Sequence, residues 1–242
     1  MKDKTKILAV AVCLLTAVTA FAKAPYEHRM TVSAQLGYAT MLRSTLETAP
    51  LDVRPWLGAA PAVGVGYQLK QGHFTFDLGC EMEYGVYTNR SRSAVTIGAT
   101  TVPQGTTEMI QNLNINIPIL FGGEWGKFYF KVGAGPSFCA YGTGSLTGAG
   151  AKAYKVSRVP QLRCHGEVGG QVGQSSDGMA RYLLAAYADY GVLNERPLQR
   201  KGSYADGVPY HVSDESTADK LNGLHVGVKF TCVLDFSKKA EQ

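Results

Sequence analysis

The chain has 242 residues, 28 of them glycine, with 18% charged residues and a formal net charge of +5 at pH 7. This length is enough for a single barrel or sandwich domain, and the high glycine content with few charges favours an all-β chain. The net charge falls to about +3 without the N-terminal segment described next, which is too weak to indicate nucleic-acid binding.

The first 22 residues have the three parts of a secretory signal peptide. Lysines occupy positions 2, 4 and 6, residues 7–18 are apolar, and residues 20–22 (Ala-Phe-Ala) form a small-x-small cleavage site. We expect residues 1–22 to be removed on export and residues 23–242 to form one domain. No apolar stretch near 18 residues follows, so the exported chain is either soluble or an outer-membrane β-barrel.

Apolar and polar residues then alternate with a period of two, which predicts β-strands. The first two predicted strands cover residues 32–39 and 62–69. The third, residues 74–86, is the clearest, because its apolar face is continuous and its polar face carries Asp77, Glu81 and Glu83. A strand of about 13 residues exceeds the usual globular length of about 5–6 and suits a tilted membrane crossing.

Five further strands are predicted, at residues 112–121, 128–138, 162–172, 182–190 and 224–236. The total of eight is even, as a closed bacterial barrel requires. Short glycine-bearing links alternate with long ones, as in outer-membrane barrels with short periplasmic turns and long outer loops. The short links are 70–73, 122–126 and 174–178, and the long links are 42–57, 88–109, 141–159 and 194–222. We therefore predict an all-β fold, an eight-stranded antiparallel up-and-down transmembrane β-barrel with both termini periplasmic.

Aromatic residues gather at the two ends of the apolar faces, as the two aromatic girdles of a membrane barrel do. The girdle at the short-turn end is predicted to contain Tyr67, Phe74, Phe121, Phe128, Tyr182 and Phe236. The girdle at the long-loop end is predicted to contain Tyr38, Tyr84, Phe138 and Tyr190. A soluble sandwich with aromatic residues scattered through its core would not produce two separate bands.

The polar faces predict a filled, charged lumen, because eight strands leave room only for side chains. Acids and bases occur at comparable heights, and buried carboxylates need paired charges or hydrogen bonds. The predicted lumen charge network contains Asp77, Glu81, Glu83, Lys131, Arg163, His165, Glu167 and Lys229. Carboxylates beside a histidine can also perform acid–base catalysis, but a filled barrel offers a substrate no entry, so we interpret the network as structural.

Other motifs predict no catalytic residues, no metal site and no cofactor. No Cys-x-x-Cys spacing occurs, and Gly133-Ala134-Gly135 lies inside a predicted strand instead of a strand-to-helix turn. Near the outer rim, Asp189, His211, Asp214 and Glu215 show no recognisable catalytic spacing. Two alternatives stay open: an outer-membrane enzyme acting on lipid or peptide at the rim, and a soluble periplasmic barrel that binds a small ligand.

Two neighbouring segments resemble a known family in their residues, in addition to having the period-two pattern of strands. Residues 116–121 (Asn-Ile-Pro-Ile-Leu-Phe) lead through a glycine turn into residues 127–136, which end in Ala134-Gly135-Pro136. This resembles the PorT-type outer-membrane β-barrel family of Bacteroidetes, in which an Ile-Pro-Leu-Leu strand precedes a strand ending in Ala-Gly-Pro. The resemblance implies a small outer-membrane barrel and a possible link to protein secretion, and it supplies no catalytic residue set.

From these patterns we expect a monomeric, non-catalytic outer-membrane barrel with a structural or surface-interaction role. Envelope integrity, adhesion and participation in an export machinery are the roles considered. The expected partners are outer-membrane lipid and, through the long loops, envelope or secretion-machinery proteins; nucleic acid is not expected.

Overall fold

The structure is a computed structural model that describes residues 26–43, 53–91, 95–97, 100–102, 104–105, 107–147, 154–157, 160–192, 199–203, 209–212 and 221–236. Within these residues no helix is long and apolar enough to cross a membrane. The predicted signal peptide, residues 1–22, lies outside the described residues.

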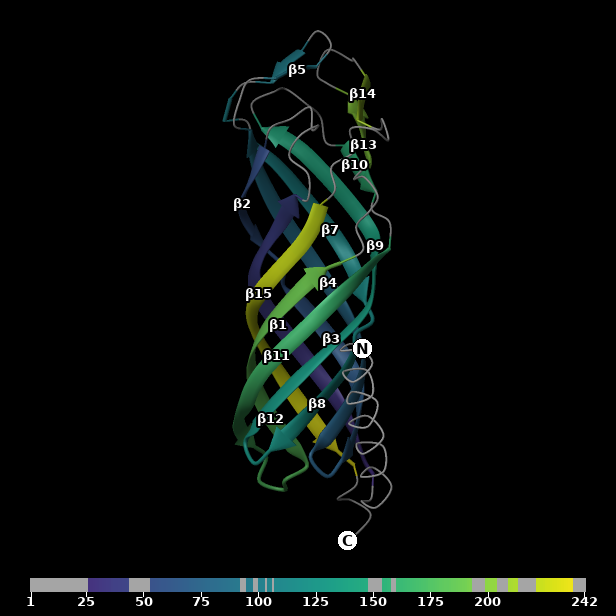
Figure 1. Ribbon diagram of the computed structural model, residues 1–242, viewed down its shortest axis with the longest axis vertical. Coiled ribbons are helices and arrows are strands. Elements are labelled where there is room, and N and C mark those ends of the chain that lie inside the picture. The colour runs from purple at the N-terminus through teal and green to yellow at the C-terminus, as the bar shows by residue number, and fades with distance from the viewer. Residues whose placement is uncertain are drawn as a thin grey trace, which may run out of the picture.

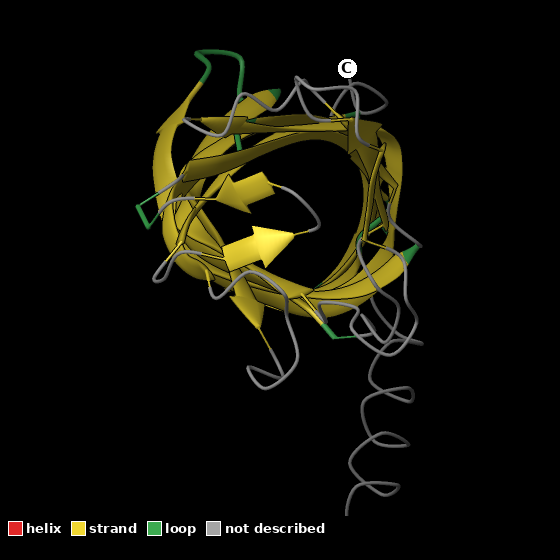
Figure 2. Ribbon diagram, turned by 90° about the horizontal axis from the view of Figure 1, so that it is seen from above, coloured by secondary structure: helices red, strands yellow, loops and turns green. Residues whose placement is uncertain are grey.

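Ten antiparallel strands build the wall of a closed barrel (Figures 1 and 2). They are β1 (Glu27–Arg43), β2 (Val53–Ala59), β3 (Ala62–Gln71), β4 (Phe74–Ser91), β7 (Thr107–Asn116), β8 (Ile119–Trp125), β9 (Phe128–Thr147), β11 (Gln161–Gln174), β12 (Ala180–Gly191) and β15 (Leu221–Asp235). Strands β2 and β3 share one position between β1 and β4, and β7 and β8 share one position between β4 and β9. Because β9 also pairs with β11, the eight positions close into a ring, which confirms the predicted fold class.

Proline causes the interruption between β7 and β8, so the prediction of one continuous strand over 112–121 is wrong at Pro118. Gly79 N donates to Pro118 O at 2.9 Å, but proline has no N–H to donate in return. On the other side, Ile117 N donates to Pro136 O at 2.9 Å, and Pro136 likewise has no N–H. The register against β4 is unchanged across the gap, so the interruption is local.

The short connections lie at one end of the barrel, as predicted, and glycine starts two of them. Gly72 has φ 59° and Gly126 has φ 61°, each as the first of two turn residues, which is the arrangement of a type II′ hairpin. The turn predicted at 122–126 is therefore misplaced, because residues 122–125 pair with β9 and only residues 126–127 form the turn. The third connection, residues 175–179, contains Gly178 with φ 69°.

At the opposite end the strands continue farther than predicted. β4 reaches Ser91 and β9 reaches Thr147, and short strands occur where long irregular loops were predicted. These are β5 (Val95–Ile97), β6 (Thr100–Val102), β10 (Tyr154–Ser157), β13 (Gln199–Ser203) and β14 (Pro209–Val212). β10 pairs with β9 and β13, and β13 pairs with β14, so part of the wall extends beyond the ring (Figure 1).

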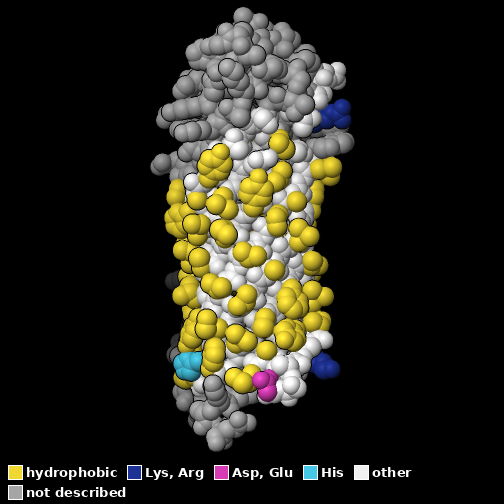
Figure 3. Space-filling view, turned by 180° about the vertical axis from the view of Figure 1, so that it is seen from behind, with side chains coloured by type: hydrophobic (Ala, Val, Ile, Leu, Met, Phe, Trp, Pro, Cys, Tyr) yellow, Lys and Arg dark blue, Asp and Glu magenta, His cyan; other side chains and the backbone are white. Residues whose placement is uncertain are grey.

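Hydrophobic side chains cover the outside of the barrel, and charged side chains fill the inside. Leu36, Val65 and Phe121 are about 60% exposed, whereas Glu83 is fully buried in the lumen. Figure 3 shows hydrophobic side chains over the length of the visible wall, with the few coloured charged and histidine side chains near its two ends. The core cluster of buried hydrophobic residues inside is small: Tyr129, Leu183, Ala185 and Val233. This distribution inverts that of a water-soluble protein.

Inward glycines allow neighbouring strands to approach closely. A Cβ at Gly133 would lie 2.0 Å from Ile119 O, and one at Gly135 would lie 1.9 Å from Ile117 O. At these two positions the glycine therefore accommodates backbone, whereas at Gly85 it accommodates the side chains of Asn112 and Tyr87. Gly133 and Gly135 thus permit the tight coiling of a narrow barrel.

Candidate functional site in the barrel lumen

All eight residues of the predicted network lie in the lumen, and each is less than a tenth exposed. They come from β4, β9, β11 and β15 and are Asp77, Glu81, Glu83, Lys131, Arg163, His165, Glu167 and Lys229. Strand pleating explains their common orientation, because each occupies an inward position of its strand. They separate into a middle group and an upper group, the upper being nearer the long-loop end.

The middle group is built around Glu167. Lys229 Nζ lies 3.2 Å from Glu167 Oε2 and 3.0 Å from Glu81 Oε1. Lys131 Nζ lies 3.7 Å from Glu167 Oε1 and donates to Asp77 Oδ1 at 2.8 Å. The two ammonium groups thus connect three carboxylates from β4 and β11.

His165 extends the middle group towards β12. Its Nδ1 lies 2.5 Å from Asp189 Oδ1 and its Nε2 lies 3.0 Å from Glu167 Oε2. Two ionised carboxylates accept hydrogen bonds but donate none, so both contacts require an imidazolium. The ring of Tyr187 stacks on the imidazole at 6.1 Å between centroids.

The upper group is built around Glu83. Arg163 donates to both of its oxygens, at 2.5 and 3.2 Å, and Asn114 Nδ2 donates to Glu83 Oε1 at 2.9 Å. His225 Nδ1 lies 3.1 Å from Glu83 Oε2, and His225 Nε2 lies 2.8 Å from Tyr87 OH. This carboxylate is fully buried and has three partners from three other strands.

Tyr87, His225 and Glu83 contact one another in the order hydroxyl, imidazole, carboxylate. Enzymes use this order of groups to activate a nucleophile. Tyr87 and His225 are each 1% exposed and Glu83 is 0% exposed. A reacting group must reach its substrate, and these side chains have no accessible surface for one. The arrangement therefore pairs buried polar groups of the upper lumen, the Tyr87 hydroxyl with the imidazole and the imidazole with the Glu83 carboxylate.

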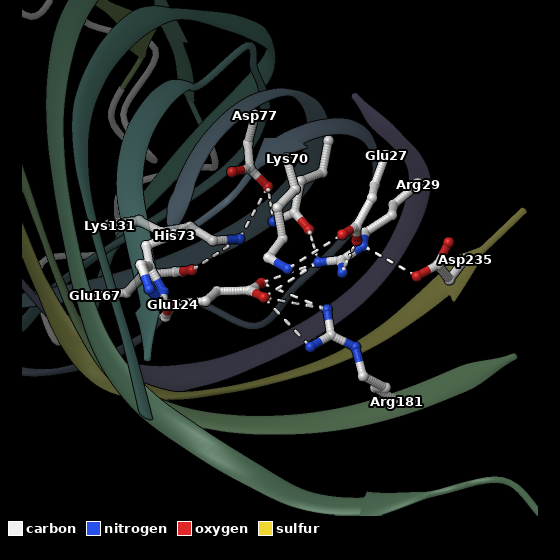
Figure 4. A network of polar contacts seen from close by, with 11 residues as sticks. Glu27, Arg29, Lys70, His73, Asp77, Glu124, Lys131, Glu167, Arg181 and Asp235 are labelled. Carbon is white, nitrogen blue, oxygen red and sulfur yellow. Dashed lines mark hydrogen bonds and ion pairs between the residues drawn. The ribbon is translucent and has the colours of Figure 1, made fainter. Parts of the chain in front are cut away.

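A third charged group, which the sequence interpretation missed, closes the turn-end mouth (Figure 4). Arg29 Nη1 donates to Glu124 Oε2 at 3.1 Å, Arg29 Nε lies 3.4 Å from Asp235 Oδ2, and Arg29 also pairs with Glu27. Arg181 Nη1 donates to Glu124 Oε2 at 3.3 Å. Continuing the period-two alternation would have placed both arginines on the inner faces of their strands, because Arg29 lies two steps before Ser33 and Arg181 lies one step before Leu183.

Gln68 joins the mouth to the middle group. Arg29 Nη1 donates to Gln68 Oε1 at 3.2 Å, and Gln68 Nε2 donates to Asp77 Oδ1 at 3.0 Å. Polar contacts therefore continue from the mouth to Glu167 and His165 without interruption. Local sequence carries no sign of this link beyond the inward position of Gln68.

Several ion pairs run across the lumen instead of along the wall. β8, which carries Glu124, is three strand positions from both β1 and β12. The Glu83–Arg163 and Glu81–Lys229 pairs also join strands three positions apart. Opposite walls are thus connected at three levels, and ion pairs occupy the space that an open channel would need.

The predicted girdle residues lie on the outside, and nine of the ten are exposed. Tyr182 is half-buried, because it stacks on Phe230 with 6.1 Å between ring centroids. Sequence interpretation missed a further stack at the turn end, where Trp125 lies between His73, at 6.1 Å, and Phe130, at 5.5 Å. Because residues 122–126 were predicted to form a turn, Trp125 was not recognised as an outward residue of the same strand as Phe121.

Metal ligation is not evident in the part of the chain that the structure describes, where no group of three His, Cys, Asp or Glu side chains is arranged to hold a metal ion. Among the described residues, Cys80, Cys164 and Cys232 are free thiols.

The site and fold define an inverted β-barrel, apolar outside and ion-paired inside. No protein-family model and no curated protein sequence matches the chain. Among solved structures, Neisserial surface protein A is 11% identical, covers 86% of this chain and 97% of its own, and has a TM-score of 0.35. The outer-membrane protease OmpT of Escherichia coli is 6% identical, covers 89% and 100%, and has a TM-score of 0.45. OprG of Pseudomonas aeruginosa is 12% identical, covers 84% and 95%, and has a TM-score of 0.40. Values this low assign no activity to the chain.

Proposed function

We propose that this protein is a non-catalytic β-barrel of a bacterial outer membrane, with its short turns and both termini towards the periplasm. The observation that carries the proposal is the inverted distribution of side chains on a closed barrel. Its outward apolar residues lie on all eight strand positions. Exposing such a belt to water is unfavourable, whereas lipid tails solvate it.

Backbone hydrogen bonding supports the same location. A spanning segment must satisfy its N–H and C=O groups without water, and a closed barrel does so between strands. The exposed aromatic residues near the two ends suit the two headgroup regions. The Trp125 stack adds to the girdle at the turn end.

The lumen favours a structural role over transport. Ion pairs cross it at the mouth through Glu124, in the middle through Glu81 and Lys229, and above through Glu83 and Arg163. Breaking such pairs leaves buried charges uncompensated, at a cost of about 3–5 kcal/mol each. The barrel is therefore a rigid membrane support for its outer segments.

The finer role we propose is surface interaction through the long connections, in envelope integrity, adhesion or an export machinery. Kinship with the PorT-type family belongs to this proposal and rests on residues 116–121 and 127–136. A soluble ligand-binding barrel would need an apolar interior, and the described lumen is charged instead.

The test is membrane fractionation followed by electrophoresis of unheated and boiled samples. A folded outer-membrane barrel will be found in the outer-membrane fraction and will change its mobility on boiling. Recovery in the soluble fraction without a heat-dependent shift would overturn the proposal. Binding to intact cells by antibodies against residues 88–109 or 194–222 would test the predicted outward orientation of the long connections.

A further inference from the structure

Two prolines each remove one hydrogen bond from the barrel wall. Gly79 N donates to Pro118 O, and Ile117 N donates to Pro136 O, each at 2.9 Å. In an antiparallel pair of this kind the partner N–H donates back to the first residue, but proline has no N–H. The carbonyl oxygens of Gly79 and Ile117 therefore have no donor in the adjacent strand.

The outer face of the wall offers these two carbonyls no donor in a membrane. Leu78 and Ile119 are paired with each other directly beside Gly79 and Pro118, and both are exposed on the apolar outer face. Lipid tails form no hydrogen bonds, so a membrane-spanning backbone must find its partners inside the protein. A donor for each carbonyl must therefore come from the lumen.

A cavity lies on the lumen side of each interrupted position. The larger one, of about 30 Å³, is lined by Gly79 and Pro118. The smaller one, of about 10 Å³, is lined by Ile117, Pro118 and Pro136. A buried water needs about 10–15 Å³ and two to four polar partners, so the larger cavity has ample room for a water and the smaller holds no more than one.

The larger cavity has polar groups that lack a partner. Asp77 and Thr231 line it and are 8% and 4% exposed. Their Asp77 Oδ2 and Thr231 Oγ1 atoms have no hydrogen-bond partner within the described part of the chain. Lys131 and Lys229 also line this cavity and already pair with its carboxylates. The cavity therefore suits a neutral molecule that both donates and accepts hydrogen bonds.

The smaller cavity has charged partners for a single water. Arg163, His165 and Asp189 line it together with Ile117. A guanidinium donates to water, and a carboxylate accepts from it. Gly135 also lines this cavity, and a Cβ there would lie 1.9 Å from Ile117 O. Glycine at this position thus leaves the inner side of the Ile117 carbonyl uncovered.

We propose that each cavity binds a buried water that replaces the N–H group missing from proline. In the larger cavity the water donates to Gly79 O and Asp77 Oδ2, and in the smaller cavity it donates to Ile117 O. Each water joins the interrupted wall to the charged lumen. The need for an inner donor rests on the proposed membrane location, but the experiment below detects the waters themselves, so it and the fractionation test can fail separately.

A crystal structure at a resolution that shows ordered waters tests the two sites. One water oxygen should lie about 2.7–3.2 Å from both Gly79 O and Asp77 Oδ2, and a second should lie at that distance from Ile117 O. A map with ordered waters elsewhere but no density in either cavity would overturn the proposal, and density in one cavity alone would overturn it for the other. A peak surrounded by oxygens at about 2.3–2.6 Å would indicate a cation and would also overturn it.

Pro118→Ala and Pro136→Ala are matched variants, and each is the control for the other. Pro118→Ala supplies an N–H for Gly79 O, so it should displace the water from Gly79 O and leave the water at Ile117 O. Pro136→Ala should do the reverse. Both variants should fold, because alanine donates to a strand ladder and proline does not. Loss of both waters in either variant, or of neither water in both, would contradict the assignment.

Magnetisation transfer from water to amide protons, measured by NMR in detergent micelles, provides a readout without a crystal lattice. The amides of Gly79 and Ile117 should show cross peaks to long-lived water. The amide of Ala185 should not, because Ala185 belongs to the buried hydrophobic cluster and lines neither cavity. Cross peaks at all three amides would show a generally hydrated lumen and would contradict two discrete sites, and their absence at Gly79 and Ile117 would overturn the proposal.

Discussion

Arg163 on β11 donates to both carboxylate oxygens of Glu83 on β4, three strand positions away across the lumen. The pair joins opposite walls at a depth where Glu83 is fully buried. Contacts of this kind determine how the barrel responds to substitution.

Glu83→Gln should destabilise the barrel by about 3–5 kcal/mol, because Arg163 then keeps its charge without a charged partner. The free energy of unfolding, measured by urea titration in detergent, provides the readout. The double variant Glu83→Leu/Arg163→Met should recover most of the loss, since it removes both charges. If the loss of stability in the double variant equalled the sum of the losses in variants of Glu83 alone and of Arg163 alone, the two residues would act independently.

At the mouth, Arg29→Gln should destabilise the barrel more than Arg181→Gln does. Arg29 pairs with Glu27, Glu124 and Asp235, whereas Arg181 pairs with Glu124. Without Arg29, the carboxylates of Glu27, Glu124 and Asp235 lose the cation that they share, and the cost of that loss falls as carboxylates are protonated on acidification. The difference in Tm between Arg29→Gln and wild type should therefore shrink on acidification. A difference independent of pH would contradict this electrostatic explanation.

Gly133→Ala should prevent correct assembly, because the added Cβ would lie 2.0 Å from Ile119 O on the adjacent strand. The fraction of refolded protein that shows heat-modifiable mobility measures the effect. Gly166→Ala is the matched control, since a Cβ there meets nothing within 4 Å. Similar folded fractions for both variants would refute the close approach at Gly133.

Val65→Arg should cost about 2–4 kcal/mol of stability in lipid, because it places a charge in the middle of the apolar belt. Val65 is 58% exposed, so the substitution removes little internal packing. Ser176→Arg, in an exposed turn, should change stability by less than about 0.5 kcal/mol. Equal stability of the two variants in vesicles would argue that Val65 does not face lipid.

The sidedness of the strands could be predicted from sequence because inward and outward positions differ in polarity along the clearest strands. Residues 74–86 illustrate this, with Glu81 and Glu83 inside and Met82 and Tyr84 outside. The pairing of particular charges could not be predicted, because partners such as Glu124 and Arg29 lie on strands that are not adjacent. Their meeting depends on how the ring closes and how its strands are staggered.

The ends of the strands were predicted less well than their centres. Polarity alternates weakly in residues 107–111 (Thr-Glu-Met-Ile-Gln), so the start of β7 was not recognised. The strand is interrupted at Pro118 because proline lacks a backbone N–H donor. The alternation of apolar and polar side chains carries no information about backbone donors, so it did not predict this interruption.

The central claim is that the outer face of the barrel contacts lipid, and the native Cys80 tests it most directly. Cys80 is exposed on β4, opposite Val65 of β3 in the middle of the belt. In outer-membrane fragments from a variant that retains Cys80 alone, a charged, membrane-impermeant maleimide should leave Cys80 unlabelled until the protein is unfolded in urea and detergent. Ser176→Cys in the same background should label at once. Rapid labelling of Cys80 in folded protein in the membrane would contradict the account.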